Sequence, residues 1–309
     1  MDAYKKIFRN AKLRIILLRT ISWLPDEKMV EIQYFIKTHR KLNLDNPKRW
    51  TEKCQWYKLY YRNPLMTKCA DKYLVREYVE EKGLGHTLNE LYGCYKNVED
   101  IDFDSLPNEF VIKSTTGSGN NIIVTDKSTL NIEEAKKKIK TWLRPTGKLA
   151  KEWAYYDIEP RIIIEKYLSE AKEGLTDYKF FCFSGKVSHL LVISDRFSDE
   201  KIDVYDADFK RQDVKLMVCP NQSKEDLPKP ENYDEMVRMA EILSKDFPHV
   251  RVDFYNINGK IIFGELTFYS GAGYYVFEPD NFDYILGEKF ILPPKKWCNV
   301  MGEKFKFPN

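Results

Sequence analysis

The stretch that decides the fold is residues 250–268, which read VRVDFYNINGKIIFGELTF. Apolar and polar residues alternate on both sides of Asn258-Gly259, and this dipeptide favours a tight turn between two strands. Because successive side chains of a strand point to opposite faces, one face of the predicted hairpin is apolar and enters a core. The other face of its first strand carries Arg251 and Asp253.

The length of the turn decides where Glu265 lies. A two-residue loop, Asn258-Gly259, puts Asp253 and Glu265 on opposite faces. A three-residue loop over 257–259, with a bulge at Gly259, puts them on the same face. We predict the three-residue loop, because a carboxylate among core side chains is costly unless it is paired or bound to a metal. This register gathers four polar residues on one face: Arg251, Asp253, Glu265 and Thr267.

The two carboxylates are candidate metal ligands. Asp253 and Glu265 are suited to Mg²⁺, a hard ion that binds one or two protein carboxylates and completes its shell with phosphate oxygens and water. The alternative is a surface ladder of salt bridges that includes Arg251. Residues 270–273, Ser-Gly-Ala-Gly, follow directly. They either donate backbone N–H groups to a phosphoryl group or acyl oxyanion, or form a plain turn.

A second stretch combines a lysine with a glycine-rich loop. Residues 110–121 read FVIKSTTGSGNN, so an apolar strand ends near Lys113 and a polar loop follows. Gly117 and Gly119 let backbone N–H groups approach phosphate oxygens closely, and the hydroxyls of Ser114 and Ser118 add donors. The lysine precedes the glycines, so the stretch fits neither a Walker A loop nor G-x-G-x-x-G. The alternative is a hairpin turn with a solvent-facing lysine.

A third stretch, residues 162–168, reads IIIEKYL. A buried strand that runs into charged and then apolar residues is typical of a hinge between two lobes, where backbone groups can pair with the edge of adenine. A core strand that ends at the surface explains the pattern equally well.

Strands and helices mix along the chain without strict β-α-β alternation, which predicts an α+β fold and not a doubly wound sheet. Periodicity predicts helices over 68–82, 133–143 and 234–247. It predicts strands over 110–113, 122–124, 161–168, 178–183, 187–193, 250–256 and 260–268. We divide the chain into a helical segment over 1–66, a first lobe over 67–168 and a second lobe over 169–309.

Composition limits the partners and the location. The formal net charge is only +3, which argues against nucleic acid as a partner. The six cysteines form no C-x-x-C pair and indicate reduced thiols in a cytoplasmic protein. No apolar run approaches the ~20 residues that span a bilayer. Basic and apolar residues alternate over 5–24, so this segment packs on its own protein, which we favour, or lies on anionic lipid at the inner face of a membrane.

The three stretches, in this order, resemble the ATP-grasp superfamily, and the chain is most similar to its teichuronopeptide-biosynthesis (TupA-like) branch. The likeness covers nearly the whole chain. Five further segments carry it: 56–65 (WYKLYYRNPL), 71–79 (DKYLVREYV), 177–186 (DYKFFCFSGK), 194–197 (SDRF) and 247–253 (FPHVRVD). The resemblance implies an ATP-grasp fold, in which two α+β lobes clasp ATP, here with a helical N-terminal segment.

The resemblance also implies roles for individual residues. Nucleotide contacts fall on Lys72, Lys113, Ser114, Gly117, Ser118, Gly119, Glu165, Lys166, Leu168, Glu173 (or Glu170) and Lys179. Among them, Glu165, Lys166 and Leu168 match the adenine-binding E-K-x-L of peptide ligases. Residues expected to act in the reaction are Lys113, Arg196 and Arg251. The metal ligands are Asp253, Glu265 and, less firmly, Thr267, which stands where the peptide ligases usually have an asparagine.

The function implied is an ATP- and Mg²⁺-dependent ligase that forms an amide through an acyl phosphate. Its substrates would be an amino acid and an acidic glycan, a uronic-acid-containing surface polysaccharide of the capsule or cell envelope or its precursor. Asp195, His189 and His249 are candidate bases for the amine, although a lone histidine is more often structural. Alternatives are a sugar phosphotransferase, a catalytically silent interaction protein, and a nucleotide-sugar glycosyltransferase that uses the D-x-D match Asp206-Ala207-Asp208.

Overall fold

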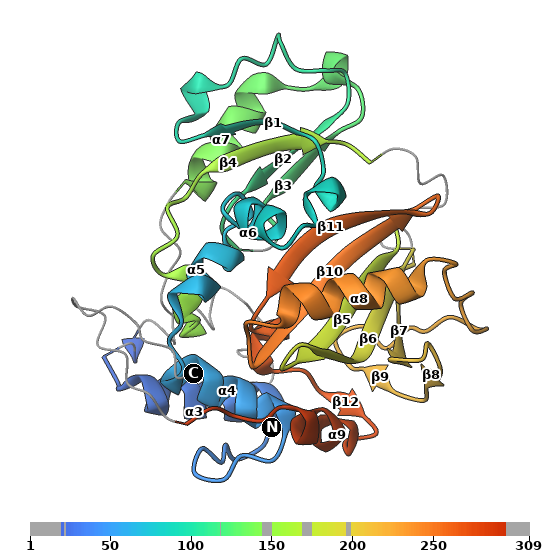
Figure 1. Ribbon diagram of the computed structural model, residues 1–309. Coiled ribbons are helices and arrows are strands. Elements are labelled where there is room, and N and C mark those ends of the chain that lie inside the picture. The colour runs from blue at the N-terminus through green and yellow to red at the C-terminus, as the bar shows by residue number, and fades with distance from the viewer. Residues whose placement is uncertain are drawn as a thin grey trace.

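The computed structural model describes residues 20–21, 23–117, 119–143, 150–168, 175–195 and 199–294. Two antiparallel sheets dominate it, and the smaller one lies above the larger one in Figure 1. The N-terminal helices and the last helix lie below the larger sheet. The α+β class predicted from the sequence is therefore confirmed.

The smaller sheet has the strand order β1-β4-β2-β3. Its strands are β1 (Leu91–Tyr95), β2 (Phe110–Ser114), β3 (Asn121–Val124) and β4 (Ile162–Lys166). Helix α7 (Ile132–Trp142) packs on one face, where Ile112, Ile139 and Ile164 share one buried cluster. Because side chains alternate along a strand, Lys113 and Glu165 lie on the opposite face, which turns toward the larger sheet.

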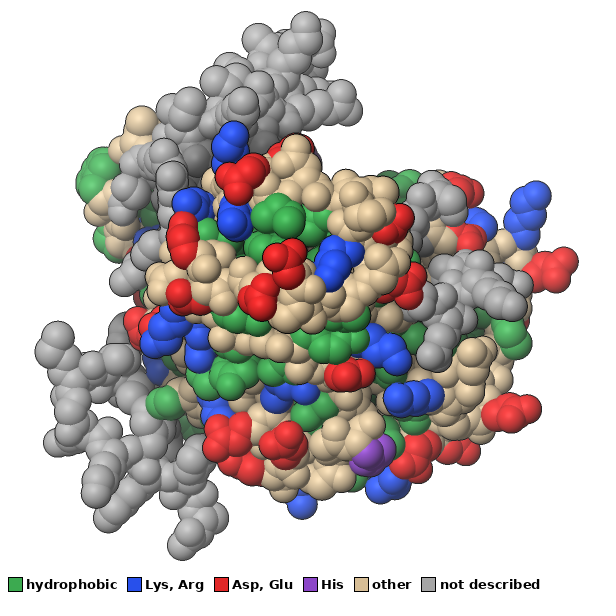
Figure 2. All heavy atoms as spheres, turned by 90° about the horizontal axis from the view of Figure 1, so that it is seen from above, with side chains coloured by type: hydrophobic (Ala, Val, Ile, Leu, Met, Phe, Trp, Pro, Cys, Tyr) green, Lys and Arg blue, Asp and Glu red, His purple; other side chains and the backbone are tan. Residues whose placement is uncertain are grey.

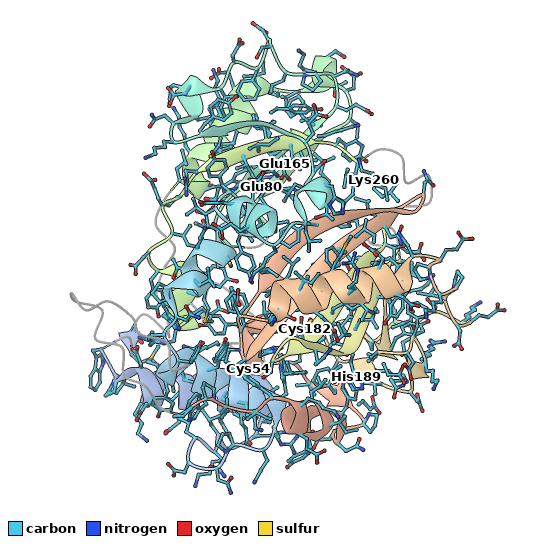
Figure 3. The ribbon with its side chains drawn as sticks, viewed as in Figure 1. Cys54, Glu80, Glu165, Cys182, His189 and Lys260 are labelled. Atoms are coloured by element: carbon cyan, nitrogen blue, oxygen red, sulfur yellow. The ribbon has the colours of Figure 1, made fainter. Side chains whose placement is uncertain are left out.

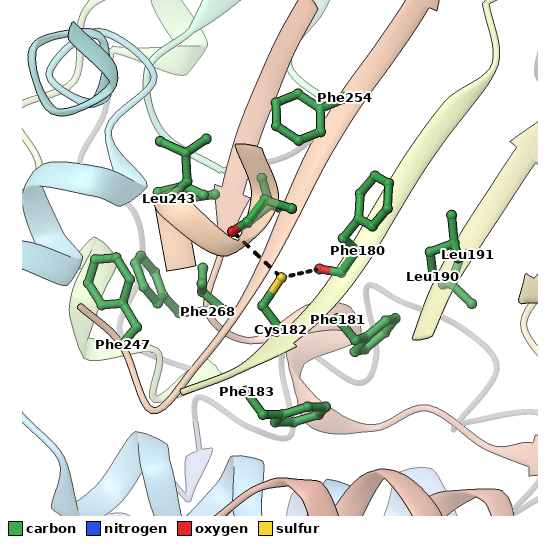
Figure 4. Packing of buried hydrophobic residues seen from close by; sticks show 14 of the residues in the cluster. Phe180, Phe181, Cys182, Phe183, Leu190, Leu191, Leu243, Phe247, Phe254 and Phe268 are labelled. Atoms are coloured by element: carbon green, nitrogen blue, oxygen red, sulfur yellow. Dashed lines mark hydrogen bonds between the residues drawn. The ribbon is translucent and has the colours of Figure 1, made fainter. Parts of the chain in front are cut away.

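The larger sheet has the strand order β11-β10-β5-β6-β7-β8. Its strands are β5 (Asp177–Phe183), β6 (Lys186–Ser194), β7 (Lys201–Asp206), β8 (Arg211–Gln212), β10 (His249–Ile257) and β11 (Lys260–Thr267). Helix α8 (Tyr233–Ser244) covers one face, and Cys182 lies between them, with its Sγ 3.9 Å from the Ala240 carbonyl (Figure 4). A two-stranded sheet, β9 (Lys215–Leu216) with β12 (Phe277–Glu278), lies beside it.

Of the remaining helices in the described part of the chain, all but the first contribute side chains to the core of the larger sheet, and the first packs on the second. They are α3 (Asp26–Thr38), α4 (Trp50–Tyr60), α5 (Pro64–Ala70), α6 (Val75–Glu81) and α9 (Phe282–Lys289). Short 3₁₀ turns are η1 (Gly85–Thr87), η2 (Val98–Asp100), η3 (Lys127–Thr129), η5 (Trp153–Tyr155) and η6 (Ser270–Gly273). Buried side chains of α5 and α6, such as Met66 and Val79, belong to the same cluster as Phe180 of β5. The core of the larger sheet thus extends into the region predicted as the first lobe.

The helix predicted over 68–82 is wrong as a single element, because the chain breaks at Asp71. The fully buried Asp71 carboxylate accepts the backbone N–H groups of Tyr73 at 2.7 Å and Leu74 at 3.0 Å. It also accepts a hydrogen bond from Arg161 at 2.8 Å. A side-chain acceptor that takes backbone donors in this way competes with helical hydrogen bonds. The break exposes Lys72 between two short helices.

The prediction of a three-residue turn in the hairpin over 250–268 is also wrong, but Asp253 and Glu265 do share a face, as predicted. Ile257 pairs with Lys260 across a two-residue loop whose residues, Asn258 and Gly259, both have positive φ (51° and 80°). A bulge then shifts the register, so that Phe254 pairs with Phe263 but Asp253 pairs with Glu265. The bulge leaves Gly264 unpaired, and the two carboxylates share a face.

Charged side chains of both signs lie on the upper face of the molecule. Figure 2, which looks down on the four-stranded sheet, shows acidic and basic side chains intermixed over that face. Within the described part of the chain, no helix is both long and apolar enough to cross a membrane. Most of the basic segment predicted over 5–24 lies outside the described residues.

The bulge at Gly264 provides a test of the register. A Cβ at this position would lie 3.1 Å from the Asp253 carbonyl oxygen, so Gly264→Val should lower the free energy of unfolding by about 3 kcal/mol, the upper range for overpacking. Gly259→Asn, at the open tip, should cost less than about 1 kcal/mol, because asparagine tolerates the left-handed conformation. Urea unfolding with an unchanged m-value measures both. A Gly264→Val variant as stable as the parent would show that the bulge does not need glycine.

Candidate active site

A pocket of about 150 Å³ lies between the two sheets. Strands of both sheets and the break between α5 and α6 supply its walls. The lining residues are Lys72, Lys113, Gly117, Gly119, Asn120, Asn121, Ile163, Glu165, Lys179, Asp253, Tyr255, Gly264 and Glu265. The pocket therefore brings together residues from all three stretches singled out in the sequence.

Lys113 projects into the pocket from the end of β2. Its ammonium lies 2.7 Å from the Glu165 carboxylate of β4, which Figure 3 places on the four-stranded sheet. Arg76 of α6 contacts the other oxygen of Glu165 at 3.4 Å and donates to the Asn89 carbonyl at 2.9 Å. Glu165 is buried, so these two cations offset the cost of its charge.

Lys72 reaches the pocket from the break between α5 and α6. Its ammonium donates to the Gly117 carbonyl at 2.6 Å and lies 3.9 Å from the Glu265 carboxylate. The backbone N–H of Lys72 also donates to the Thr115 carbonyl at 3.3 Å. Lys72 thus connects the glycine-rich loop of the smaller sheet to the carboxylate strand of the larger one.

Asp253 is the most constrained carboxylate of the pocket, with a residue exposure of only 2%. The Arg251 guanidinium donates to both of its oxygens at 2.7 Å, in the bidentate geometry that makes such pairs strong. Lys179, which pairs with Asp253 across β5 and β10, adds a third donor at 2.6 Å.

Glu265 is more open, with 35% of its side chain exposed. Burial would raise the pKa of Glu265, but the nearby Lys72 ammonium, Arg251 guanidinium and Lys179 ammonium outweigh it and lower the pKa to about 2. The carboxylate is therefore ionised at neutral pH. Thr267 donates to Glu265 at 3.0 Å and accepts from Arg251 at 3.1 Å, so its hydroxyl is engaged within the cluster.

The donor set suits a hard divalent cation, although the protein's own cations compete for it. Two carboxylates face one pocket that has room for phosphate oxygens, which is the ligand class that Mg²⁺ takes. Arg251 and Lys179 occupy both oxygens of Asp253, whereas one oxygen of Glu265 has only the more distant Lys72. Among the described residues, no group of three or more acidic, histidine or cysteine side chains is arranged as a metal site.

The other predicted site residues either lie away from the pocket lining or lie outside the described residues. Ser114 is buried and its hydroxyl bonds to Thr116 at 3.1 Å. Both backbone groups of Lys166 are bonded, the N–H to Glu90 at 3.0 Å and the carbonyl to Asn89 at 2.8 Å. Neither these two residues nor Leu168 line the pocket in the described part of the chain. The residues that lie outside the described part are Ser118, Glu170, Glu173 and Arg196.

The candidate bases lie in other surroundings. His249 is fully buried, bonds to Trp50 at 3.1 Å and to the Cys182 carbonyl at 2.9 Å, and burial lowers its pKa to about 4. His189 lies on the larger sheet far from Glu165 (Figure 3), and burial lowers its pKa to about 4 as well. Asp195 is paired with Lys201 at 2.7 Å. The two histidines are therefore structural.

The D-x-D match has a local explanation. The Asp206 carboxylate accepts the backbone N–H groups of Asp208 at 3.0 Å and Lys210 at 2.9 Å, so it closes the turn after β7. Asp206 and Asp208 line a separate hollow with His189 and not the lysine-lined pocket.

Sequence reasoning missed Arg76, which supports Glu165. The signal was present, because Arg76 stands four residues after Lys72 in the segment 71–79. In a continuous helix, residues four positions apart lie on the same face. The break at Asp71 instead directs Lys72 to the glycine loop and Arg76 to β4.

The chain is similar in fold to several solved ligases. A D-alanine–D-alanine ligase from Bacillus anthracis shares 20% identity over 64% of this chain and 56% of that chain, with a TM-score of 0.40. An L-amino acid ligase from Bacillus licheniformis shares 17% identity over 66% and 44%, with a TM-score of 0.41. A D-cycloserine synthetase shares 20% identity over 74% and 72%, with a TM-score of 0.38. The chain spans about half the length of the first of these structures.

No curated protein sequence matches the chain. A family model does: the one described as TupA-like ATPgrasp matches residues 52–291, which is well over half of the chain and includes every lining residue of the pocket. The chain therefore belongs to the TupA-like ATP-grasp family.

Proposed function

We propose that the protein is an ATP-dependent ligase that activates a carboxylate as an acyl phosphate and passes it to an amine. The observation that carries the proposal is the convergence of Lys72, Lys113 and Lys179 on one pocket with Asp253 and Glu265. Three ammonium groups from three different elements match the charge of a triphosphate, and two carboxylates match the metal that accompanies it.

The reaction needs two displacements. A substrate carboxylate oxygen attacks the γ-phosphorus, the bond to the β–γ bridging oxygen breaks, and ADP leaves. The amine nitrogen then attacks the acyl carbon, inorganic phosphate leaves, and the amine loses a proton to solvent. Lys113 and Arg251 would offset the charge that spreads over the phosphoryl oxygens. No side-chain nucleophile is required.

A magnesium ion would be held by Asp253 and Glu265, with Thr267 as a weaker candidate, and would offset negative charge on the phosphoryl oxygens. Each of these carboxylates contacts a cation of the chain. Binding of a triphosphate would draw Lys72 and Lys179 toward its oxygens. The freed carboxylate oxygens would then accept the metal, so metal and nucleotide should bind cooperatively.

The substrates we propose are an amino acid and a uronic-acid-containing surface glycan or its precursor, joined through an amide in the cytoplasm. The support is the membership of the TupA-like family, together with the resemblance of the sequence to the teichuronopeptide-biosynthesis branch. The basic N-terminal segment would allow peripheral contact with the inner face of the membrane.

The reaction type can be tested with MgATP, a panel of amino acids and an acidic oligosaccharide that contains uronic acid. We expect ADP and inorganic phosphate to appear together only when a carboxylate and an amine are both present. ADP with the phosphate retained on the product would indicate a phosphotransferase. Release of UDP from a UDP-sugar without ATP would indicate a glycosyltransferase.

Two substitutions test the site. Lys113→Ala and Glu265→Gln should each lower the rate of ADP formation by at least about 100-fold, because the first removes a positive charge that faces the phosphates and the second removes a proposed metal ligand. Lys186→Ala and Glu241→Gln are matched controls. Lys186 at the start of β6 lies 2.9 Å from Glu241 of α8, and neither residue lines the pocket. Full activity in both Lys113→Ala and Glu265→Gln would overturn the site assignment.

Cooperative binding of metal and nucleotide can be tested without turnover. Mn²⁺ binding, followed by electron paramagnetic resonance, should tighten on the order of tenfold or more when ADP is added. Lys179→Met should raise the affinity for Mn²⁺ alone, because Asp253 loses one of its two cationic partners. Lys186→Met should change neither value. Equal Mn²⁺ affinity with and without ADP in the parent protein would contradict the exchange of partners.

A further inference from the structure

We propose that Lys58 and Gln55 of α4 are positioning residues, which clamp the turn at 271–273 and thereby hold Arg251 in place. Neither residue lines the pocket. The proposal rests on the proposed function in one respect, namely that Arg251 acts on the phosphoryl group. The claim that Lys58 and Gln55 hold the turn rests on the contacts alone.

The turn after β11 has an unfavourable backbone. Gly271 (φ 53°, ψ 30°) and Ala272 (φ 54°, ψ 25°) are left-handed, and Gly273 follows with φ 68°. A run of left-handed residues is disfavoured for L-amino acids because the Cβ crowds the following carbonyl oxygen. Ala272 carries a Cβ, so surrounding contacts must hold this conformation.

Helix α4 supplies those contacts. The Ala272 carbonyl accepts hydrogen bonds from Lys58 Nζ at 2.6 Å and from Gln55 Nε2 at 3.2 Å. The Gly273 carbonyl accepts a second bond from Gln55 Nε2 at 2.7 Å. The approach is close, since a Cβ at Gly273 would lie only 2.5 Å from Gln55 Nε2. Two side chains of one helix thus hold consecutive carbonyls of the turn.

This turn also contacts Arg251. Ser270, which is fully buried, begins η6, and its hydroxyl lies 3.3 Å from Arg251 Nη1. The other nitrogens of Arg251 bind Asp253 and Glu265. Movement of the turn would therefore remove the contact on one side of the guanidinium and leave those on the carboxylate side.

The clamp uses a buried charge. Lys58 has no exposed surface, and few groups of the described residues face it. They are Cys54 from its own helix, the Ala150 carbonyl and Glu152 from the segment before η5, and the rings of Tyr269 and Tyr274 beside the turn. A methionine of similar length would avoid the cost of burying an ammonium. The ammonium is therefore explained by what it binds, which is the Ala272 carbonyl at 2.6 Å and, more distantly, the Ala150 carbonyl at 3.5 Å.

The charge state of Lys58 gives the proposal a pH signature. Burial lowers the pKa of Lys58 to about 8, although Glu152 acts in the opposite direction. In the unfolded chain its pKa is the ordinary 10.5. Below pH 8 both states are protonated and the folded state bears the full cost of the buried charge. That cost is relieved as the pH rises from 8 to 10.5, while the hydrogen bonds of the ammonium to the turn weaken.

The experiment compares Lys58→Met with Lys53→Met in the full-length protein. Lys53 is a matched control, because it lies on the same helix and also donates to backbone carbonyls, those of Gly287 and Phe290, both at 2.7 Å. At pH 7, amide hydrogen exchange over 269–275 should be at least tenfold faster in Lys58→Met and unchanged in Lys53→Met. Affinity for MgADP should stay within twofold in both variants.

Two further readouts separate a positioning role from a merely structural one. In the ligase assay, Lys58→Met should lower kcat at least tenfold with an unchanged KM for ATP. In the parent protein, exchange over 269–275, corrected for intrinsic rates, should rise as the pH passes 8, and this step should be absent in Lys58→Met. The melting temperature of Lys58→Met should exceed that of the parent at pH 7, and the difference should narrow toward pH 10.

Unchanged exchange over 269–275 in Lys58→Met would overturn the proposal, as would a pH step that persists in the variant. If Lys58→Met does not fold, the pH dependence of exchange in the parent protein decides alone, and a flat profile overturns the proposal. A failed proposed function would show itself separately, as absence of MgADP binding and of ADP formation in the parent protein.

Discussion

The site depends on the buried carboxylate of Asp253 and its three N–H donors. A carboxylate with 2% exposure is tolerated only when its charge is matched by well-aligned partners. Arg251 can supply two donors because it lies two residues away on the same face of β10, and Lys179 can supply the third because β5 pairs with β10 in register. The pairing of β5 with β10 therefore also places the charged side chains of the pocket beside one another.

Internal ion pairs and hydrogen bonds balance the charges that line the pocket. Lys113 is paired with Glu165, Lys179 with Asp253, and Lys72 lies near Glu265 and bonds to the Gly117 carbonyl. These partners hold long, flexible side chains in one region at little electrostatic cost. A triphosphate with its metal presents the same two signs of charge, so it can replace the internal partners without leaving an ion uncompensated.

The sequence allowed the strands of the site to be predicted more securely than their connections. Period-two alternation predicts β10 and β11, and short apolar runs predict β2 and β4, since each strand contributes side chains to a core. The break at Asp71 was not predictable from periodicity, because it depends on Arg161, which is ninety residues away. The bulge at Gly264 was missed for a similar reason: the Asn-Gly turn dominates the local pattern, and the bulge is favoured only by the pairing of carboxylates with distant cations. The same limit applies to Lys58, whose partners lie in two remote loops.

The register at Asp253 and Glu265 is set by a bulge within the hairpin and not by its tip. Residues beyond the bulge, from Tyr255 to Ile262, continue as a regular two-stranded arm that ends in Asn258-Gly259. Among the described residues, no atom lies within 4 Å of a Cβ added at Gly259, whose carbonyl accepts a hydrogen bond from Asn232 at 2.8 Å. Surface loop tips of this kind accept insertions, so a short epitope or a fluorophore-bearing peptide grafted there would leave the carboxylates undisturbed. The arm is therefore a natural handle for immobilising or labelling the enzyme.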